Sequence, residues 1–130
     1  MLGKWVFGMI FVVMQCIPFG NVADAQEQAP MVRLSKLVVD PLHLPAYRAA
    51  LKEEIEASIR LEPGVLTLYA VFEVKNPTHL TILEIYRDRS AYEAHLATPH
   101  FQKYKTGTGH MVNSLELIDA EPLIPDLKIK

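Results

Sequence analysis

The chain has 130 residues, 50% of them hydrophobic, and a formal net charge of -2. This length favours one domain, and a charge balance without a Lys/Arg cluster argues against a nucleic-acid partner. A single cysteine excludes a disulfide framework within the chain.

Residues 1–25 have the pattern of a signal peptide. Lys4 provides a positively charged start, Trp5–Met14 is a short apolar run without charge, and Ala23–Ala25 has the small-x-small pattern that signal peptidase recognises. Because the run is too short to cross a bilayer as a permanent helix, we expect no stable membrane anchor. We predict cleavage near Ala25 and export of the mature protein to the periplasm or the medium.

Cleavage at this point would change the chemistry open to the mature chain. It would remove Cys16 and Trp5, the only cysteine and the only tryptophan, so no thiol nucleophile would remain. Lipidation of Cys16 is an alternative that the preceding Met14-Gln15 makes less favourable. A polar leader, residues 26–30, would then begin the mature chain.

The first segments after the leader predict a strand and a long helix. Val32–Val39 begins with alternating polarity and ends apolar on both faces, which is typical of a strand. Pro45 opens a helix with an apolar stripe at three- and four-residue spacing, and Glu62–Gly64 ends it.

A hairpin and two short helices follow. Val65–Val74 and Leu80–Tyr86 are rich in β-branched and aromatic residues and predict two paired strands. Ser90–Glu93 has the spacing of a capping box for a helix that runs through Leu96. Thr98-Pro99 is the start signal of another helix, with Thr as N-cap and Pro in the first position.

The order of the predicted elements defines the fold class. A glycine-interrupted stretch, Thr106–Gly109, leads to a last strand at Ser114–Ile118, and residues 122–130 form an irregular tail. The order β-α-β-β-α-β over residues 31–121 predicts an α+β, ferredoxin-like domain with an antiparallel sheet and both helices on one face. The uncovered apolar face would be an association surface, so we predict a homodimer joined through the sheets.

Three segments carry a resemblance to a known family. They are AYRAALKEEIEASI (46–59), EPGVLTLYAVFE (62–73) and LEIYRDRSAYEAHLATPHF (83–101). Together they resemble the antibiotic biosynthesis monooxygenase family, over about Met31–Ile118. The resemblance implies a dimeric α+β barrel of ferredoxin-like subunits. Relatives include oxygenases of quinols or polyketide phenols that use no metal or flavin, haem-degrading proteins and an isomerase of a sugar-derived signal, so the fold does not define the reaction.

The resemblance also narrows the expected chemistry. Haem-degrading relatives, and some polyketide oxygenases, use a tryptophan, and Trp5 would leave with the signal peptide. With the tryptophan-dependent activities set aside, the resemblance implies a cofactor-independent monooxygenase that oxidises a small electron-rich quinol or phenol with O2. Such a protein binds the ring in an apolar pocket and removes the hydroxyl proton, and the anion is easier to oxidise. A non-catalytic small-molecule-binding dimer and an isomerase of a small enolisable metabolite stay open as alternatives.

His95 and Glu84 are the candidate catalytic residues. His95 borders the apolar stripe of its short helix, where a neutral imidazole could take a phenolic proton. Alternatively, it is a C-terminal histidine that interacts with the helix dipole and the last carbonyls. Glu84 lies in the middle of a strand, where a carboxylate is costly unless paired. It could orient a histidine or a substrate hydroxyl, or form an ion pair with Arg33 or Arg87.

The candidate substrate-binding residues are aromatic side chains and a second histidine: Tyr69, Phe72, Tyr86, His100 and Phe101. His100 lies in the first turn of its helix, where the positive end of the dipole disfavours imidazolium, so we expect His95 to be the histidine that matters for chemistry. We expect neither a metal nor an organic cofactor. The two histidines are separated by a proline break, the other histidines are spread over loops, and the chain has no glycine-rich phosphate loop.

Overall fold

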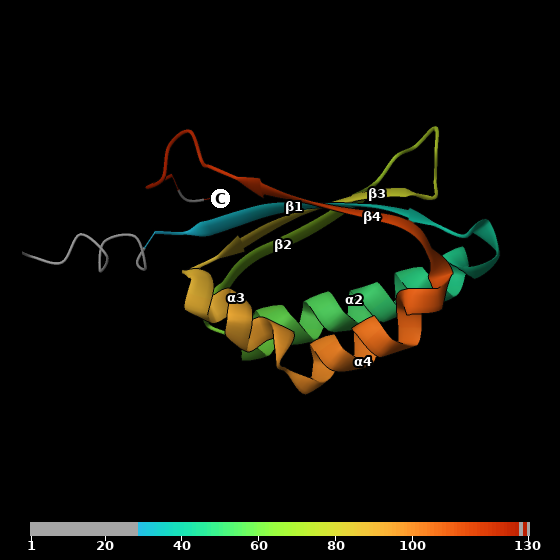
Figure 1. The fold of residues 1–130 in the computed structure, drawn as a ribbon, viewed down its shortest axis with the longest axis horizontal. Coiled ribbons are helices and arrows are strands. Elements are labelled where there is room, and N and C mark those ends of the chain that lie inside the picture. Colours follow the sequence, from blue (N-terminus) through green and yellow to red (C-terminus); the bar gives the residue numbers. More distant parts are fainter. Residues whose placement is uncertain (1–28, 128, 130) are drawn as a thin grey trace, which may run out of the picture.

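The computed structural model describes residues 29–127 and residue 129, so the predicted signal peptide lies outside the described residues. The described chain forms a four-stranded antiparallel sheet with three α-helices against one face (Figure 1). None of the described helices is long and apolar enough to cross a membrane.

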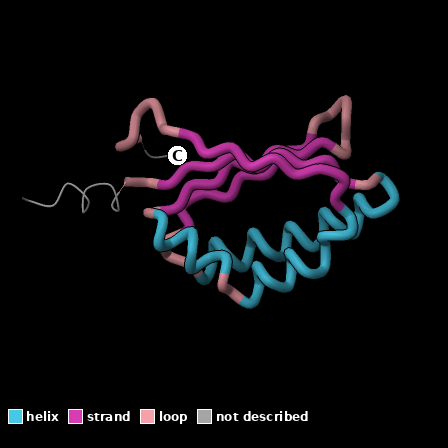
Figure 2. The backbone as a smooth tube through the Cα atoms, in the orientation of Figure 1, coloured by secondary structure: helices cyan, strands magenta, loops and turns pink. Residues whose placement is uncertain are grey.

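The order of elements confirms the predicted α+β, ferredoxin-like fold. The strands are β1 (Met31–Val39), β2 (Val65–Phe72), β3 (His79–Tyr86) and β4 (Val112–Ala120). The helices are α2 (Leu44–Leu61), α3 (Arg89–Leu96) and α4 (Pro99–Thr108), with short 3₁₀ turns η1 (Pro41–His43) and η2 (Gly109–Met111). The strands lie in the order β2-β3-β1-β4, and Figure 2 shows the helices as a separate layer along one side of this sheet.

Two local boundaries differ from the sequence-based prediction. Helix α3 begins at Arg89, because Asp88 and not Ser90 is its N-cap; the Asp88 carboxylate accepts a 2.7 Å hydrogen bond from the Ala91 N–H. Helix α4 continues through Gly107 to Thr108, where an irregular stretch was expected. The predicted Thr98 cap is confirmed, since its hydroxyl accepts a bond from the Phe101 N–H.

The main core lies between the sheet and α2. Its buried members come from β1, α2 and β3: Leu37, Val39, Tyr47, Leu51, Leu80 and Ile82. A second cluster, made of Val65, Tyr86 and Ala91, joins the sheet to α3. Gly64 permits this second contact, because a Cβ at its position would lie 2.6 Å from the Ala91 Cβ.

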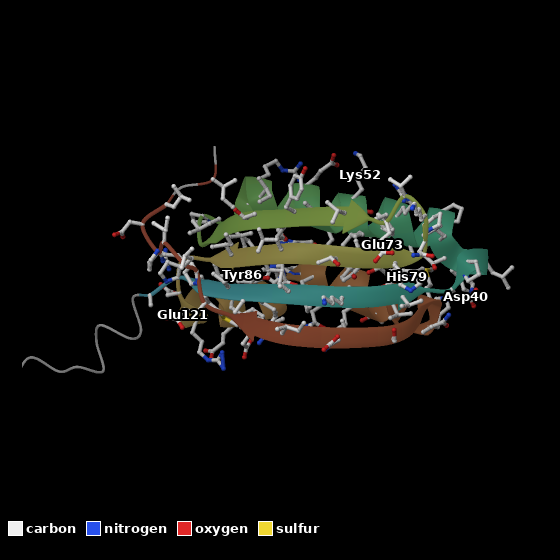
Figure 3. All side chains as sticks on the ribbon, turned by 90° about the horizontal axis from the view of Figure 1, so that it is seen from above. Asp40, Lys52, Glu73, His79, Tyr86 and Glu121 are labelled. Atoms are coloured by element: carbon white, nitrogen blue, oxygen red, sulfur yellow. The ribbon has the colours of Figure 1, made fainter. Side chains whose placement is uncertain are left out.

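The other face of the sheet has no helix over it in the described chain (Figure 3). Antiparallel pairing aligns Tyr69, Leu83, Leu34 and Ile118 in a row across all four strands. These residues alternate along each strand with those that face the helices. Tyr69 is 66% exposed, and the other three are half-buried.

Candidate active site

A cavity of about 550 Å³ lies between the sheet and the helices. Most of its lining is apolar, and its polar members come from all three α-helices and from β1, β3 and β4. Leu115 and Leu117 of β4 line it as well, yet they are 57% and 52% exposed. The cavity therefore opens along β4, where the helices do not cover the sheet.

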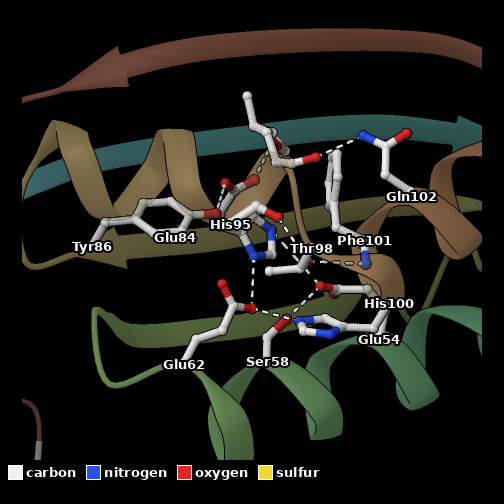
Figure 4. Close-up of polar contacts among 12 residues, drawn as sticks. Glu54, Ser58, Glu62, Glu84, Tyr86, His95, Thr98, His100, Phe101 and Gln102 are labelled. Atoms are coloured by element: carbon white, nitrogen blue, oxygen red, sulfur yellow. Dashed lines mark hydrogen bonds and ion pairs between the residues drawn. The ribbon is translucent and has the colours of Figure 1, made fainter.

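His95 lies in the polar part of this wall. It belongs to the last turn of α3, and only 3% of its surface is exposed. Its ring packs between those of Tyr86 and Phe101, with centroid distances of 5.4 and 4.7 Å. Its two nitrogens face two different glutamates, Glu62 and Glu54 (Figure 4).

Glu62, the C-cap residue of α2, joins two histidines. Its Oε2 lies 3.0 Å from His95 Nδ1 and 2.7 Å from His100 Nε2. Burial would raise the pKa of Glu62, but the hydrogen bonds from His100 and His95 outweigh it and hold this pKa below its ordinary value. An ionised carboxylate only accepts hydrogen bonds, so both nitrogens donate to it. Neutral His95 therefore carries its proton on Nδ1, and its Nε2 is free to accept one.

Glu54 faces that free nitrogen from α2. Its Oε1 is 3.7 Å from His95 Nε2, which is too far for a direct hydrogen bond. Burial raises the pKa of Glu54, and the hydrogen bond that Ser58 donates at 2.6 Å lowers it only in part. The raised pKa favours the neutral form of Glu54 more than in an exposed carboxyl. Glu54 and the free Nε2 stand opposite each other, with a gap that a small hydroxyl group can bridge.

Glu84 occupies the sheet wall of the cavity. It accepts hydrogen bonds from the hydroxyls of Ser35 and Tyr86, the latter at 2.9 Å. Neither ion pair considered for it from sequence is present, because Arg33 pairs with Asp119 and Arg87 pairs with Asp88. Burial and the neighbouring Glu84 raise the pKa of Tyr86, which keeps its hydroxyl a neutral donor.

The comparison with known proteins defines the family. The model of the antibiotic biosynthesis monooxygenase family matches residues 30–107, from β1 into α4. The chain belongs to this family. A solved candidate antibiotic biosynthesis monooxygenase from Bacteroides thetaiotaomicron is 63% identical, with a TM-score of 0.77 over 80% of this chain and 99% of that one.

More distant members of the comparison share the fold. A candidate monooxygenase from Lactobacillus acidophilus is 29% identical, with a TM-score of 0.68, over 69% of this chain and 43% of that one. A candidate antibiotic biosynthesis monooxygenase from Nitrosomonas europaea, at 22% identity, has a TM-score of 0.70 over 75% and 94% of the two chains. A comparison with curated proteins gave no match. Family and fold confirm the resemblance inferred from the sequence.

The structure brings some of the predicted site residues of this family member to one cavity. His95, Glu84, Tyr86 and Phe101 line it. Tyr69 does not, because its position on β2 pairs with Leu83 on the open face.

Two further candidates also lie outside the cavity lining. Phe72 lies in a separate groove between α2 and β2, where the Arg48 guanidinium stacks 4.1 Å from its ring centroid. His100 lies behind the wall, bonded to Glu62, with 16% of its side chain exposed.

Sequence reasoning missed both glutamates that face His95. Glu54 carries a signal that could have found it, since it occupies a buried position of the α2 stripe together with Tyr47, Leu51 and Ser58. A carboxylate at an apolar position is costly to bury and so indicates a partner or a function. Glu62 was interpreted only as a helix stop, and no local pattern points from it to the histidines.

The same cluster has the composition of a metal site. Glu54, His95 and His100 each place one ligand atom within 4.8 Å of the others. Two histidines and a carboxylate suit zinc or iron(II). His95 and His100 already bond Glu62 and Glu54 already accepts from Ser58, so a metal would have to displace these contacts. The expectation of a metal-free site stays a prediction, although the two histidines are neighbours in space.

Proposed function

We propose that this protein is a cofactor-independent monooxygenase that oxidises a small electron-rich quinol or phenol with O2. The observation that carries the proposal is a buried His95 whose free Nε2 faces Glu54 in the wall of a largely apolar cavity. Membership of a monooxygenase family supports the reaction class. The apolar lining suits an aromatic ring better than a hydrophilic sugar-derived substrate.

The polar groups divide the proton chemistry between them. A substrate hydroxyl in the gap donates its proton to His95 Nε2, and Glu62 stabilises the imidazolium through its bond to Nδ1. Glu54 faces the same gap, and in the neutral form that burial favours it would donate a hydrogen bond to the phenolate that forms. A carboxylic acid kept neutral by burial is an effective donor to a developing anion.

His100 supports Glu62 from outside the cavity lining. Glu62 bonds both histidines through one oxygen, and the His100 side chain is the more exposed of the two. Because His100 Nε2 already donates to Glu62, it does not take a proton from it, and its bond instead holds the carboxylate against His95 Nδ1. This gives His100 a positioning role that does not require contact with the substrate.

Oxidation then follows from the anion itself. The phenolate transfers an electron to O2, and the two radicals combine at a ring carbon. One oxygen atom stays on the ring and the other leaves as water, so a hydroquinone becomes a hydroxyquinone. All of the electrons come from the substrate, so an exported protein needs no cellular reductant for this reaction.

Oxygen uptake by the purified mature protein, residues 26–130, tests the proposal. A panel of hydroquinones and phenols is offered, and isotopically labelled O2 is traced into the product by mass spectrometry. Metal and flavin analysis of the same sample, with and without chelator treatment, tests cofactor independence. We expect uptake that a chelator leaves unchanged. Uptake that follows metal content would contradict cofactor independence, and binding without uptake would favour the small-molecule-binding alternative.

A further inference from the structure

We infer that the substrate carries a carboxylate attached to the ring through a short arm, and that Arg33 binds it. This inference rests on the proposed function and names the substrate class of the same cavity. It uses a group that the proton chemistry leaves unused: a buried guanidinium in the cavity wall.

Arg33 is held rigidly on the helix-facing side of β1. It lines the cavity and is 9% exposed. Its Nε and Nη2 lie 2.9 and 2.7 Å from one oxygen of Asp119, and its Nη1 donates to the Tyr92 hydroxyl at 2.5 Å. The guanidinium also stacks 4.6 Å from the centre of the Tyr92 ring. A cation fixed in this way needs little reorganisation to bind an anion.

The guanidinium has donors to spare. An arginine offers five N–H groups and stays charged in proteins. The contacts with Asp119 and Tyr92 use three of them, which leaves two without a partner among the described residues. Planar, two-point binding of a carboxylate is the interaction that a guanidinium makes best.

The carboxylate that pairs with Arg33, that of Asp119, is exposed to solvent. The Asp119 side chain, on the edge strand β4, is 72% exposed, whereas that of Arg33 is 11% exposed. An exposed carboxylate neutralises a buried cation only weakly, because water competes for it. The other cationic residue of the lining, Lys105, is exposed on α4. Positive charge inside the cavity is therefore concentrated at Arg33.

The position of Arg33 relative to His95 suggests the arm. Two aromatic rings connect them through a series of contacts: the guanidinium stacks on Tyr92, Tyr92 contacts Tyr86 at 5.3 Å, and Tyr86 contacts His95 at 5.4 Å between centroids. A ligand that reaches both ends presents a hydroxyl to His95 and a carboxylate to Arg33. An aromatic ring with a short acidic arm has this arrangement.

Anaerobic titration calorimetry tests the inference, because binding is then measured without turnover. The probes are homogentisate, a hydroquinone with an acetate arm, its neutral methyl ester and hydroquinone itself. We expect homogentisate to bind about 10- to 100-fold more tightly than the ester, the range of one charged hydrogen-bond pair. Equal binding of acid and ester would overturn the inference, as would the absence of binding by either.

Three variants assign the effect to Arg33. Arg33→Met should remove the preference for the acid and leave ester binding unchanged. Asp119→Asn should tighten binding of the acid, because a competing negative charge is gone; a purely structural Arg33–Asp119 pair predicts no gain. Arg87→Met is the matched control, since Arg87 is a partly exposed arginine paired with Asp88 outside the cavity. If Arg33→Met does not fold, the acid–ester comparison and Asp119→Asn still decide the matter.

Oxygen uptake with the same probes separates this inference from the proposed function. Uptake with acid and ester alike, together with equal binding, would keep the monooxygenase and reject the carboxylate site. Tight, Arg33-dependent binding of homogentisate without uptake would reject the monooxygenase and keep the carboxylate site.

Discussion

At the scale of single residues, the two histidines of the site differ in what their nitrogens face. His95 has one nitrogen on Glu62 and the other opposite Glu54 at the cavity wall, whereas His100 bonds Glu62 from outside the lining. A general base needs a free nitrogen that reaches the substrate. Only His95 meets this requirement among the two.

This difference predicts unequal effects of substitution. His95→Ala should lower turnover by about 10²-fold or more, the usual scale for a general base. His100→Ala should cost much less, because His100 lies outside the cavity lining and Glu62 keeps its bond to His95. Steady-state oxygen uptake measures both, with sedimentation as a check that the assembly is unchanged. If both variants turn over normally, neither histidine is the general base and the pair only connects two helices.

Glu62 makes stability depend on pH. Its folded-state pKa is lowered from an ordinary value of 4.5, so its contribution is fully present above that value and is lost as pH falls through the folded pKa. Glu62→Gln should therefore cost about 2 kcal/mol at neutral pH, the scale of hydrogen bonds to a charged group, and progressively less in acid. The raised pKa of Glu54 makes its own contribution to stability fall as pH rises. The wild-type protein and Glu62→Gln both retain Glu54, His95 and His100, so these groups do not produce the difference between the two proteins.

Urea unfolding of both proteins between acid and neutral pH measures this difference. Glu56→Gln, on the solvent-exposed side of α2, is the control. It should change the unfolding free energy by less than about 0.5 kcal/mol, which is usual for substitutions at exposed sites. A Glu62→Gln cost that stays constant over the whole pH range would contradict the role of the ionised carboxylate.

At the scale of elements, the approach of α3 to the start of β2 depends on one glycine. A Cβ on Gly64 would lie 2.6 Å from the Ala91 Cβ, whereas one on Gly107 in α4 would have no neighbour within 4 Å. Two glycine substitutions of identical chemistry should therefore act in opposite directions.

Gly64→Ala should lower the unfolding free energy by about 1–3 kcal/mol, the usual cost of overpacking. Gly107→Ala should raise it by about 0.5–1 kcal/mol, because alanine loses less backbone entropy in a helix. Thermal unfolding followed by circular dichroism compares the two. A tolerated Gly64→Ala would show that α3 can move away from β2 without loss.

At the scale of the whole molecule, the open face of the sheet leaves large side chains such as Tyr69 and Val71 exposed. Proteins of this family are typically dimers. Val71 on this face is 46% exposed, and it lies close to the row of Tyr69, Leu83 and Leu34. Packing two such faces together would bury them in a symmetric interface.

We therefore predict a homodimer joined through the sheets. Sedimentation of the mature protein should give roughly twice the chain mass of about 12 kDa. Val71→Lys should shift the equilibrium toward monomer, because it would place a charge in the interface. Leu42→Lys, at an 86% exposed position on η1, should not. A wild-type protein that remains monomeric at micromolar concentration would refute the prediction.

Residues 1–25 predict that the protein is exported from the cell. Expression with residues 1–25 in place should yield an exported protein that begins near Gln26, because the segment has the charge, length and small-x-small end of a signal peptide. N-terminal sequencing of the periplasmic material checks this. Exported material that begins at Met1 would exclude cleavage.

The sequence by itself determined the elements and their order. Helix and strand patterns are local, so apolar spacing predicted α2, and Thr98-Pro99 predicted the start of α4. The order β-α-β-β-α-β then left few ways to pack the elements, and this is why the ferredoxin-like fold could be predicted from the chain alone.

Only the tertiary structure decided which side chains meet. Glu62 bonds His95 and His100 across 33 and 38 positions, and Arg33 bonds Asp119 across 86. No local period encodes such pairs, because they depend on how the elements pack and on the sheet register. The same reason separates Tyr69 from the cavity, since a one-residue step along a strand moves a side chain to the other face.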